Sequence, residues 1–248
     1  MALGAHAAPA AAADTQAAMT QGTLARINRD REARGLTKLR PWAPLNQLAA
    51  ERAASMASRD QLSHDAAGGD VGAEYDQRGI QWYGYGEIIG ESNATYGTAA
   101  AAFIYKLWKG SPPHSAILFS RHYNYIGIGF AYRPSNGTTW ASIVFADSKD
   151  HTGPLVARTS KHVHGRTVTF AWRGHDRRMQ TREAGFGSFD VEYRVDSGPW
   201  RMIRNNTHAT SITLRHRARG HTYSYRVRGT DRRGNLSAWT SAGRVRVP

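Results

Sequence analysis

The sequence predicts an α+β domain followed by an all-β sandwich. Before residue 110, apolar residues recur with the helical period in three segments. After Asp150 they alternate with polar residues in short runs that contain no helical pattern. The charge changes at the same point, because residues 1–150 carry 14 Lys and Arg against 13 Asp and Glu, whereas residues 151–248 carry 19 against 6. Such a combined change is typical of a domain boundary.

The bulk composition excludes several classes of protein. The chain has 248 residues, 40% of them hydrophobic, which is enough for two packed cores. It has no cysteine, so disulfides, thiolate catalysis and cysteine zinc sites are excluded. No apolar stretch approaches the roughly 20 residues of a membrane-spanning helix, and we therefore expect no transmembrane segment.

The first twenty residues are rich in alanine and lack the charged start and leucine-rich centre of a complete signal peptide. They do contain small-x-small steps, such as Ala5-His6-Ala7, of the kind found at cleavage sites. We interpret residues 1–20 as the remnant of an export leader or as a linker. The leader interpretation predicts an extracellular or cell-envelope location.

Three helices are predicted in the first domain. The first covers residues 23–34, and Gly35 is placed to end it in the left-handed conformation. The second begins near Pro44, and its predicted core residues are Leu45, Leu48, Ala49, Ala53, Met56 and Ala57. The third covers residues 98–109 and ends at Gly110. Its predicted buried stripe is Ala100, Phe103, Ile104, Leu107 and Trp108.

Two strands complete the first domain, which we place at residues 21–149. In "YIGIGFAYR" large apolar residues alternate with glycine and alanine, so one face is small enough for a close neighbour. The segment "TTWASIVFAD" is expected to pair with it across the turn "RPSNG". Helices and strands without a regular strand–helix repeat indicate an α+β domain.

The second domain is predicted to be a β-sandwich. Residues 150–160 are assigned to a linker and first strand, and residues 161–248 to the rest of the sandwich. The segments "TVTFAW", "FDVEYRV" and "YSYRV" alternate strictly, and turns such as "DSGP" and "DRRGN" separate them.

This second half resembles a fibronectin type III module. The similarity rests on "RGHTYSYRVRGTDRRGNLSAWT". It implies that Tyr223 occupies the tyrosine-corner position, with its hydroxyl returning to the upstream backbone, and that Trp172 is the buried tryptophan of the second strand. Such modules are mostly spacers or binding platforms, so the resemblance does not imply catalysis.

The first half resembles the cysteine-free bacterial branch of the CAP superfamily, the group of cysteine-rich secretory proteins, antigen 5 and pathogenesis-related proteins. The matching segments stand in the family's order. They are "INRDREARGLTKL", "LAAERAASMASRDQLSHD", "YGEIIGE", "LWKGSPPHSAIL", "YNYIGIGF" and "TTWASIVFAD". The resemblance implies that the α+β domain is a CAP-type α-β-α sandwich.

The resemblance also implies a cleft formed by His64, Glu87 and His114. In the family, two histidines and two acids line a central cavity, and Ser111 stands here where the second acid would be. Ile88 also replaces the usual asparagine after Glu87. We therefore expect His64 and His114 to bind a divalent ion such as zinc only weakly, and the three cleft residues are also the candidates for any catalysis.

The residues around His114 support such a site independently. Ser111 is a good N-cap, a proline suits the first helical position, and His114 then lies in the first turn. The positive end of the helix dipole favours a neutral imidazole, which can bind a cation or accept a proton. Glu91 is a weaker candidate for the missing acid, and Trp82, Tyr83 and Tyr85 are expected in the core or at the cleft rim.

Three functions remain open from the sequence. The first is an exported CAP protein whose cleft binds a small ligand, such as a lipid or a wall fragment. The second is a hydrolase that uses His64, Glu87 and His114, although no G-x-S-x-G segment is present. The third is a purely adhesive surface protein. We favour the first together with attachment through the second domain, and leave the question of enzymatic activity open.

The charge of the second domain predicts an anionic partner. Arg226 and Arg228 are expected on the outward face of a strand, and Arg215, Arg217 and Arg219 are expected to alternate in the same way. Because few acids balance these residues, we expect binding to an anionic polymer of the cell envelope. No base-reading motif is present, so we expect no specific nucleic acid partner.

Overall fold

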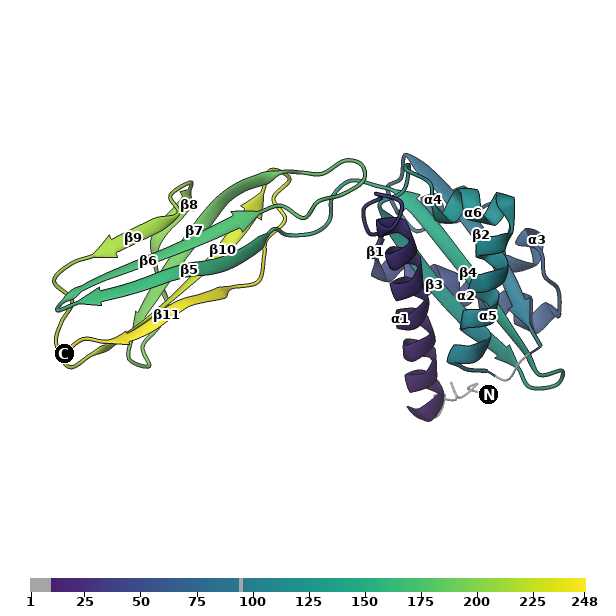
Figure 1. Cartoon of the computed structure of the whole chain (residues 1–248), viewed down its shortest axis with the longest axis horizontal. Coiled ribbons are helices and arrows are strands. Elements are labelled where there is room, and N and C mark those ends of the chain that lie inside the picture. The colour runs from purple at the N-terminus through teal and green to yellow at the C-terminus, as the bar shows by residue number, and fades with distance from the viewer. Residues whose placement is uncertain (1–9, 94–95) are drawn as a thin grey trace. The chain divides into compact units, whose positions relative to one another are not determined.

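The computed structural model describes residues 10–93 and 96–248 and divides the chain into two compact units (Figure 1). Unit 1 comprises Met1–Ser148 and Met179–Thr181, and unit 2 comprises Lys149–Arg178 and Arg182–Pro248. The boundary after Ser148 coincides with the change in charge and periodicity. The short segment Met179–Thr181 is the exception, because Met179 is buried in a core cluster of unit 1.

Unit 1 contains six helices and four strands within the described residues. They are α1 (Ala10–Glu32), β1 (Arg40–Pro41), α2 (Ala43–Arg59), α3 (His64–Ala67), α4 (Val71–Gln77), β2 (Gly84–Ser92), α5 (Thr98–Gly110), α6 (Pro112–Leu118), β3 (Tyr125–Arg133) and β4 (Thr138–Asp147). The strands form one sheet in the order β1-β3-β4-β2, in which the three long strands are antiparallel. β2 is therefore an edge strand.

Helices cover both faces of this sheet. Residues of α1, α5 and α6 form one core cluster with Ile88, Ile128 and Ile143, whereas residues of α2 and α4 form another with Tyr125 and Val144. These side chains alternate between the two faces because successive residues of a strand point in opposite directions. The arrangement confirms the predicted α+β class and the α-β-α sandwich.

Small residues on β3 allow α2 to lie directly on the sheet. A Cβ added at Gly127 would lie 2.1 Å from the carbonyl of Leu45, and one added at Gly129 would lie 2.2 Å from the carbonyl carbon of Ala49. The glycine face predicted for close approach is thus the α2 face. All six predicted core residues of α2 are buried.

Two predictions for the helices of unit 1 are wrong in part. α1 begins at Ala10 rather than Thr23, because Met19, Thr23 and Ile27 fall on one buried face. Residues 10–20 are therefore helical rather than a linker, and residues 1–9 lie outside the described residues. In α5, Phe103 and Leu107 are 50% and 51% exposed, because the buried face of that helix is formed by Ala100, Ala101, Ile104, Tyr105 and Trp108.

Unit 2 is built from seven strands. They are β5 (Leu155–His164), β6 (Thr167–His175), β7 (Phe186–Val195), β8 (Arg201–Thr207), β9 (Ser211–Leu214), β10 (Thr222–Asp231) and β11 (Thr240–Arg246). They form two antiparallel sheets, β5-β6-β9 and β11-β10-β7-β8. The two sheets enclose one apolar core, as expected for a fibronectin type III-like sandwich. The first strand extends to His164, beyond the predicted limit at residue 160.

The signature residues of the sandwich behave as predicted. The backbone N–H of Ala218 donates a hydrogen bond of 3.0 Å to the hydroxyl of Tyr223, which completes the tyrosine corner. Trp172 is 2% exposed and packs edge-on against Phe189.

The predicted basic face of β10 is not a free cationic surface. Arg226 and Arg228 are half-buried, and each pairs across the sheet with an acid of β7, Glu192 and Asp190 respectively. The guanidinium of Arg226 also lies 4.5 Å from the centre of the Trp239 ring. Placing these two arginines on the outward face was correct, but describing them as unbalanced was wrong.

The three other arginines singled out in the sequence do not lie on a strand, because β9 ends at Leu214. They belong to the loop between β9 and β10. Arg166 holds this loop, since its side chain donates hydrogen bonds to the carbonyls of Arg217 and His216.

Across the described residues, no helix has the length and apolarity needed to span a membrane.

Candidate functional site

The segment between α2 and β2 forms two short capped helices that carry the site. Ser63 caps α3, and its hydroxyl accepts a hydrogen bond of 3.0 Å from the N–H of Ala66. Asp70 caps α4 in the same way, through the N–H of Ala73 at 2.8 Å. Serine and aspartate are preferred caps because their short side chains satisfy these otherwise unpaired N–H groups. The first cap fixes His64 at the start of α3.

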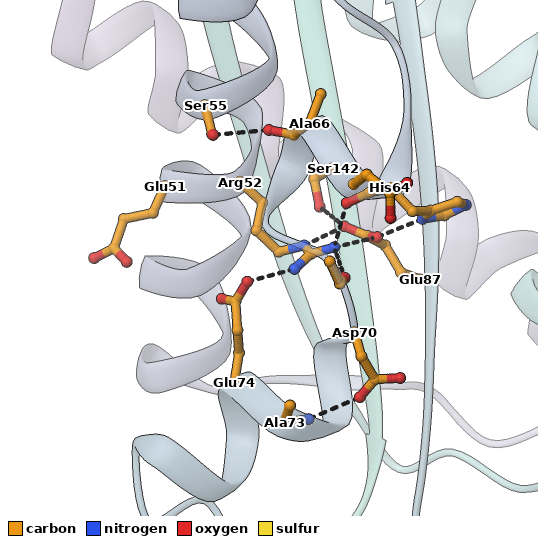
Figure 2. Close-up of polar contacts among 12 residues, drawn as sticks. Glu51, Arg52, Ser55, His64, Ala66, Asp70, Ala73, Glu74, Glu87 and Ser142 are labelled. Atoms are coloured by element: carbon orange, nitrogen blue, oxygen red, sulfur yellow. Dashed lines mark hydrogen bonds and ion pairs between the residues drawn. The ribbon is translucent and has the colours of Figure 1, made fainter.

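Glu87 is the centre of the site, and its carboxylate is fully engaged (Figure 2). The guanidinium of Arg52 donates to both oxygens, with Nε–Oε1 at 2.6 Å and Nη2–Oε2 at 2.7 Å. Oε1 also accepts from the hydroxyl of Ser142 at 2.8 Å. Nδ1 of His64 lies 2.6 Å from Oε2. Only 3% of the Glu87 side chain is exposed, so these contacts replace the water that would otherwise solvate the charge.

Arg52 connects Glu87 to a second acid. Figure 2 shows its guanidinium between Glu87 and Glu74, whose Oε1 lies 2.6 Å from Nη1. The Arg52 side chain is fully buried. Burial lowers the pKa of Arg52, but the hydrogen bonds and charges of Glu87 and Glu74 outweigh this effect and raise it above its usual value. The guanidinium thus remains charged within the core.

The His64–Glu87 contact determines what the imidazole can do. A carboxylate at Nδ1 favours the tautomer that carries the proton on that nitrogen. Nε2 then holds the lone pair, and 58% of the His64 side chain is exposed. The pair can therefore accept a hydrogen bond or a proton from a bound molecule, while Glu87 stabilises the charged imidazole that results.

His114 lies on α6, where it contacts Ser111. Nδ1 of His114 is 2.8 Å from the Ser111 hydroxyl, so Ser111 occupies the N-cap position but makes no side-chain bond to the helix backbone. Partial burial, followed by the charge of His64, lowers the pKa of His114. A neutral imidazole was predicted, although the expected cause was the helix dipole.

An open pocket of about 370 Å³ lies at the exposed side of His64. Its lining residues are His64, Asp65, Gly69, Asp70, Val71, Tyr85 and Glu87. The hydroxyl of Tyr85 donates a hydrogen bond of 2.7 Å to Asp70, which lowers the pKa of that acid. The structure thus brings His64 and Glu87 together at one pocket, whereas His114 is not among its lining residues.

The contacts of Glu87 do not fit a metal centre with this acid as third ligand. Both of its oxygens already accept hydrogen bonds, and the Arg52 guanidinium beside them repels a dication. Ser111, at the position of a second acid, is directed to His114. Within the described ranges, His64, Glu87 and His114 do not form a set of three converging ligand atoms.

Arg52 and Glu74 were not among the site residues predicted from the sequence. The signal for Arg52 was present, because it falls four residues after Leu48 and four before Met56, both predicted to be buried. An arginine at such a position needs buried acceptors. Tyr85 was expected in the core or at the cleft rim and lines the pocket, whereas Glu91 does not line it.

Comparisons with known proteins agree with this fold. The family model described as the cysteine-rich secretory protein family, CAP, matches residues 24–145. No curated protein matches the chain significantly.

Several solved structures are similar to parts of this chain. An extracellular protein containing an SCP domain from Bacillus anthracis is 18% identical, with a TM-score of 0.47, over 58% of this chain and 45% of its own. An outer surface protein from Borrelia burgdorferi is 17% identical, with a TM-score of 0.47, over 53% of this chain and 93% of its own. A human fibronectin type III domain is 21% identical, with a TM-score of 0.30, over 42% of this chain and 85% of its own.

This chain therefore spans less than half the length of the Bacillus anthracis protein. The family match covers helices α2 to α6, the second part of α1, the site residues and the sheet of unit 1 up to residue 145. Residues 24–145 of the chain are thus a CAP domain of the cysteine-rich secretory protein family, and a fibronectin type III-like sandwich follows it.

Proposed function

We propose that the CAP domain binds a small, hydroxyl-bearing ligand, such as a fragment of a wall glycan, in the pocket beside His64. The observation that carries this proposal is the His64–Glu87 pair, which presents a half-exposed imidazole at an open pocket. Such an imidazole nitrogen, supported by a buried carboxylate, is a strong acceptor for a hydroxyl group.

The lining of the pocket favours a polar ligand over a lipid chain. Asp65, Asp70, Tyr85 and Glu87 contribute charged or hydroxyl groups, whereas Val71 is the one aliphatic side chain of the lining. A hydrocarbon chain would cover these polar groups without bonding to them, which is unfavourable. The acids also disfavour an anionic ligand, so we expect a neutral or cationic one.

The test uses the full chain and three probes. A trisaccharide of N-acetylglucosamine and its deacetylated, cationic form represent wall glycans, and lauric acid represents lipids. Calorimetric titration should show binding of the sugars, tighter for the cationic form, and none of lauric acid. His64→Ala should abolish sugar binding, whereas His122→Ala, on an exposed segment, should not change it. Binding of lauric acid alone, lost in His64→Ala, would overturn the polar-ligand proposal.

Hydrolysis is a second candidate, and the same His64–Glu87 contact favours it. An imidazole oriented by a carboxylate at 2.6 Å is suited to act as a general base toward a water molecule. Release of reducing ends from the neutral trisaccharide, lost in His64→Ala but not in His122→Ala, would support it. Binding of the trisaccharide without turnover would restrict the domain to ligand binding.

We further propose that the sandwich attaches the protein to an anionic polymer of the cell envelope. Residues 151–248 carry 19 Lys and Arg against 6 acids. Four of those acids are already engaged by a neighbouring side chain or loop: Asp190, Glu192, Asp196 and Asp231. Exposed arginines such as Arg215 and Arg219 therefore contribute to a positive field. Both proposals correspond to an exported, extracellular or envelope-associated protein.

A further inference from the structure

Three buried carboxylates meet at one end of the sandwich. Asp150 precedes β5, Asp176 follows β6, and Asp231 is the last residue of β10. Their exposed fractions are 1%, 7% and 4%. One carboxylate oxygen from each lies within 4.8 Å of the other two. All three belong to unit 2, so this unit forms the cluster by itself.

Two of the three carboxylates are held by their own loops. Oδ1 of Asp231 accepts hydrogen bonds of 2.8 Å from the backbone N–H groups of Arg233 and Asn235. Oδ1 of Asp150 accepts from the N–H of Thr152 at 2.9 Å and from its hydroxyl at 2.6 Å. These bonds fix the direction of each carboxylate before any ligand is present.

Asp176 differs from the other two. Its Oδ1 accepts a hydrogen bond of 2.8 Å from the N–H of Arg177. Its Oδ2 is buried and has no hydrogen-bond partner among the residues that the structure describes. A buried carboxylate oxygen without a partner is costly, because burial removes its water and nothing replaces it.

The electrostatic environment increases this cost. Burial raises the pKa of Asp176, and the negative charges of Asp150 and Asp231 add to the effect, although the backbone N–H groups of Arg177 and Gly185 partly oppose it. A proton on one carboxylate would relieve this repulsion, and a cation that bonds to all three would relieve it as well. Only a cation would bond to the three converging oxygens at once. It would also give Oδ2 of Asp176 the partner that it lacks.

The donor set indicates which cation fits. Three carboxylates with no nitrogen or sulfur ligand beside them in the described residues suit a hard cation, and each offers one oxygen to the cluster. Because the ligands come from loops and strand ends of different elements, an adaptable coordination shell fits better than the strict octahedron of Mg²⁺. We propose that Asp150, Asp176 and Asp231 form a Ca²⁺ site that joins the ends of β6 and β10 to the segment before β5.

The test compares the full chain in EGTA with the full chain in millimolar CaCl₂. We expect Ca²⁺ to raise the midpoint of thermal unfolding, with one saturable site by calorimetry and a smaller effect of MgCl₂ at the same concentration. Asp176→Asn should abolish the Ca²⁺ response. In EGTA this variant should unfold at the same temperature as the wild type or higher, because it removes a buried, unpartnered charge.

Two control variants separate this site from other acids and from the pocket of the CAP domain. Asp196→Asn changes an exposed acid of the sandwich and should keep the full Ca²⁺ response. His64→Ala should keep it too, so the outcome is independent of the proposed ligand pocket. The inference is overturned if Ca²⁺ neither binds nor shifts the midpoint. It is also overturned if Asp176→Asn keeps the response, or if His64→Ala loses it.

Discussion

Arg52 on α2 and Glu87 on β2 form a bidentate ion pair inside the CAP domain, with donor–acceptor distances of 2.6 and 2.7 Å. Neither side chain has more than 3% of its surface exposed. The pair ties the helix to the edge strand and holds the carboxylate that orients His64. It therefore serves both the stability of the domain and the geometry of the pocket.

Breaking this pair from one side should destabilise the domain strongly. Arg52→Met leaves Glu87 buried without its cation, and we expect a loss of about 3–5 kcal/mol in the free energy of unfolding. Urea denaturation measures it. Arg59→Met, at an exposed position of the same helix, is the matched control and should cost less than about 0.5 kcal/mol. Equal losses in the two variants would show that the ion pair contributes little.

The imidazole of His114 should be harder to protonate than a free histidine side chain. Because burial and the charge of His64 lower the pKa of His114, a larger fraction of its imidazole should stay neutral as the pH falls through the ordinary pKa of histidine. The unfolded chain then binds more protons than the folded chain in that range, so this group reduces stability as the pH falls below its ordinary pKa. NMR of the imidazole Cε1–H resonances measures the pKa directly.

A variant separates the two causes of that shift. His64→Ala should move the pKa of His114 upward, because the repulsion is removed, but not fully to its ordinary value, because burial remains. His122→Ala should leave it unchanged. A pKa of His114 that is insensitive to His64 would mean that the two rings do not interact.

Zinc should bind the CAP domain only weakly. Glu87 is occupied by Arg52, and the two imidazoles alone provide fewer protein ligands than the three of a typical catalytic zinc site. In a titration with zinc chloride, we expect weak uptake that decreases as protons compete for the imidazoles at lower pH. The double change His64→Ala and His114→Ala should remove it. Tight zinc binding that survives this change would contradict the assignment.

Binding of the full chain to an anionic polymer such as polyglutamate should be electrostatic. We expect retention to weaken steeply as salt shortens the range of the positive field. Arg215→Glu combined with Arg219→Glu should weaken it further, because both residues are exposed in the loop after β9.

The matched control places the same charge change on the CAP domain. Lys106→Glu combined with Arg121→Glu alters two exposed residues there and should affect retention much less. Equal effects of the two double variants would show that only the net charge matters. Retention that does not depend on salt would show that charge does not control attachment.

Local pattern was sufficient to predict the helices α2 and α5, the strands β3, β4, β6, β7 and β10, and the order of the two domains. The apolar period of α2 and the alternation of β10 are set by neighbouring residues, and both lie where the sequence predicted them. Tyr223 was identified from its motif, and its hydroxyl bond follows from that position. His64 and Glu87 were assigned from the resemblance to the CAP superfamily, and the structure brings them to one pocket.

Only the tertiary structure decided which charges meet. Arg52 and Glu87 are 35 residues apart and Arg226 and Glu192 are 34 apart, so no local period indicates either pair. The three acids at the end of the sandwich come from separate segments that are adjacent only after both sheets form. Periodicity reports which face of an element is buried, whereas ion pairs and ligand clusters depend on the register between elements distant in the sequence.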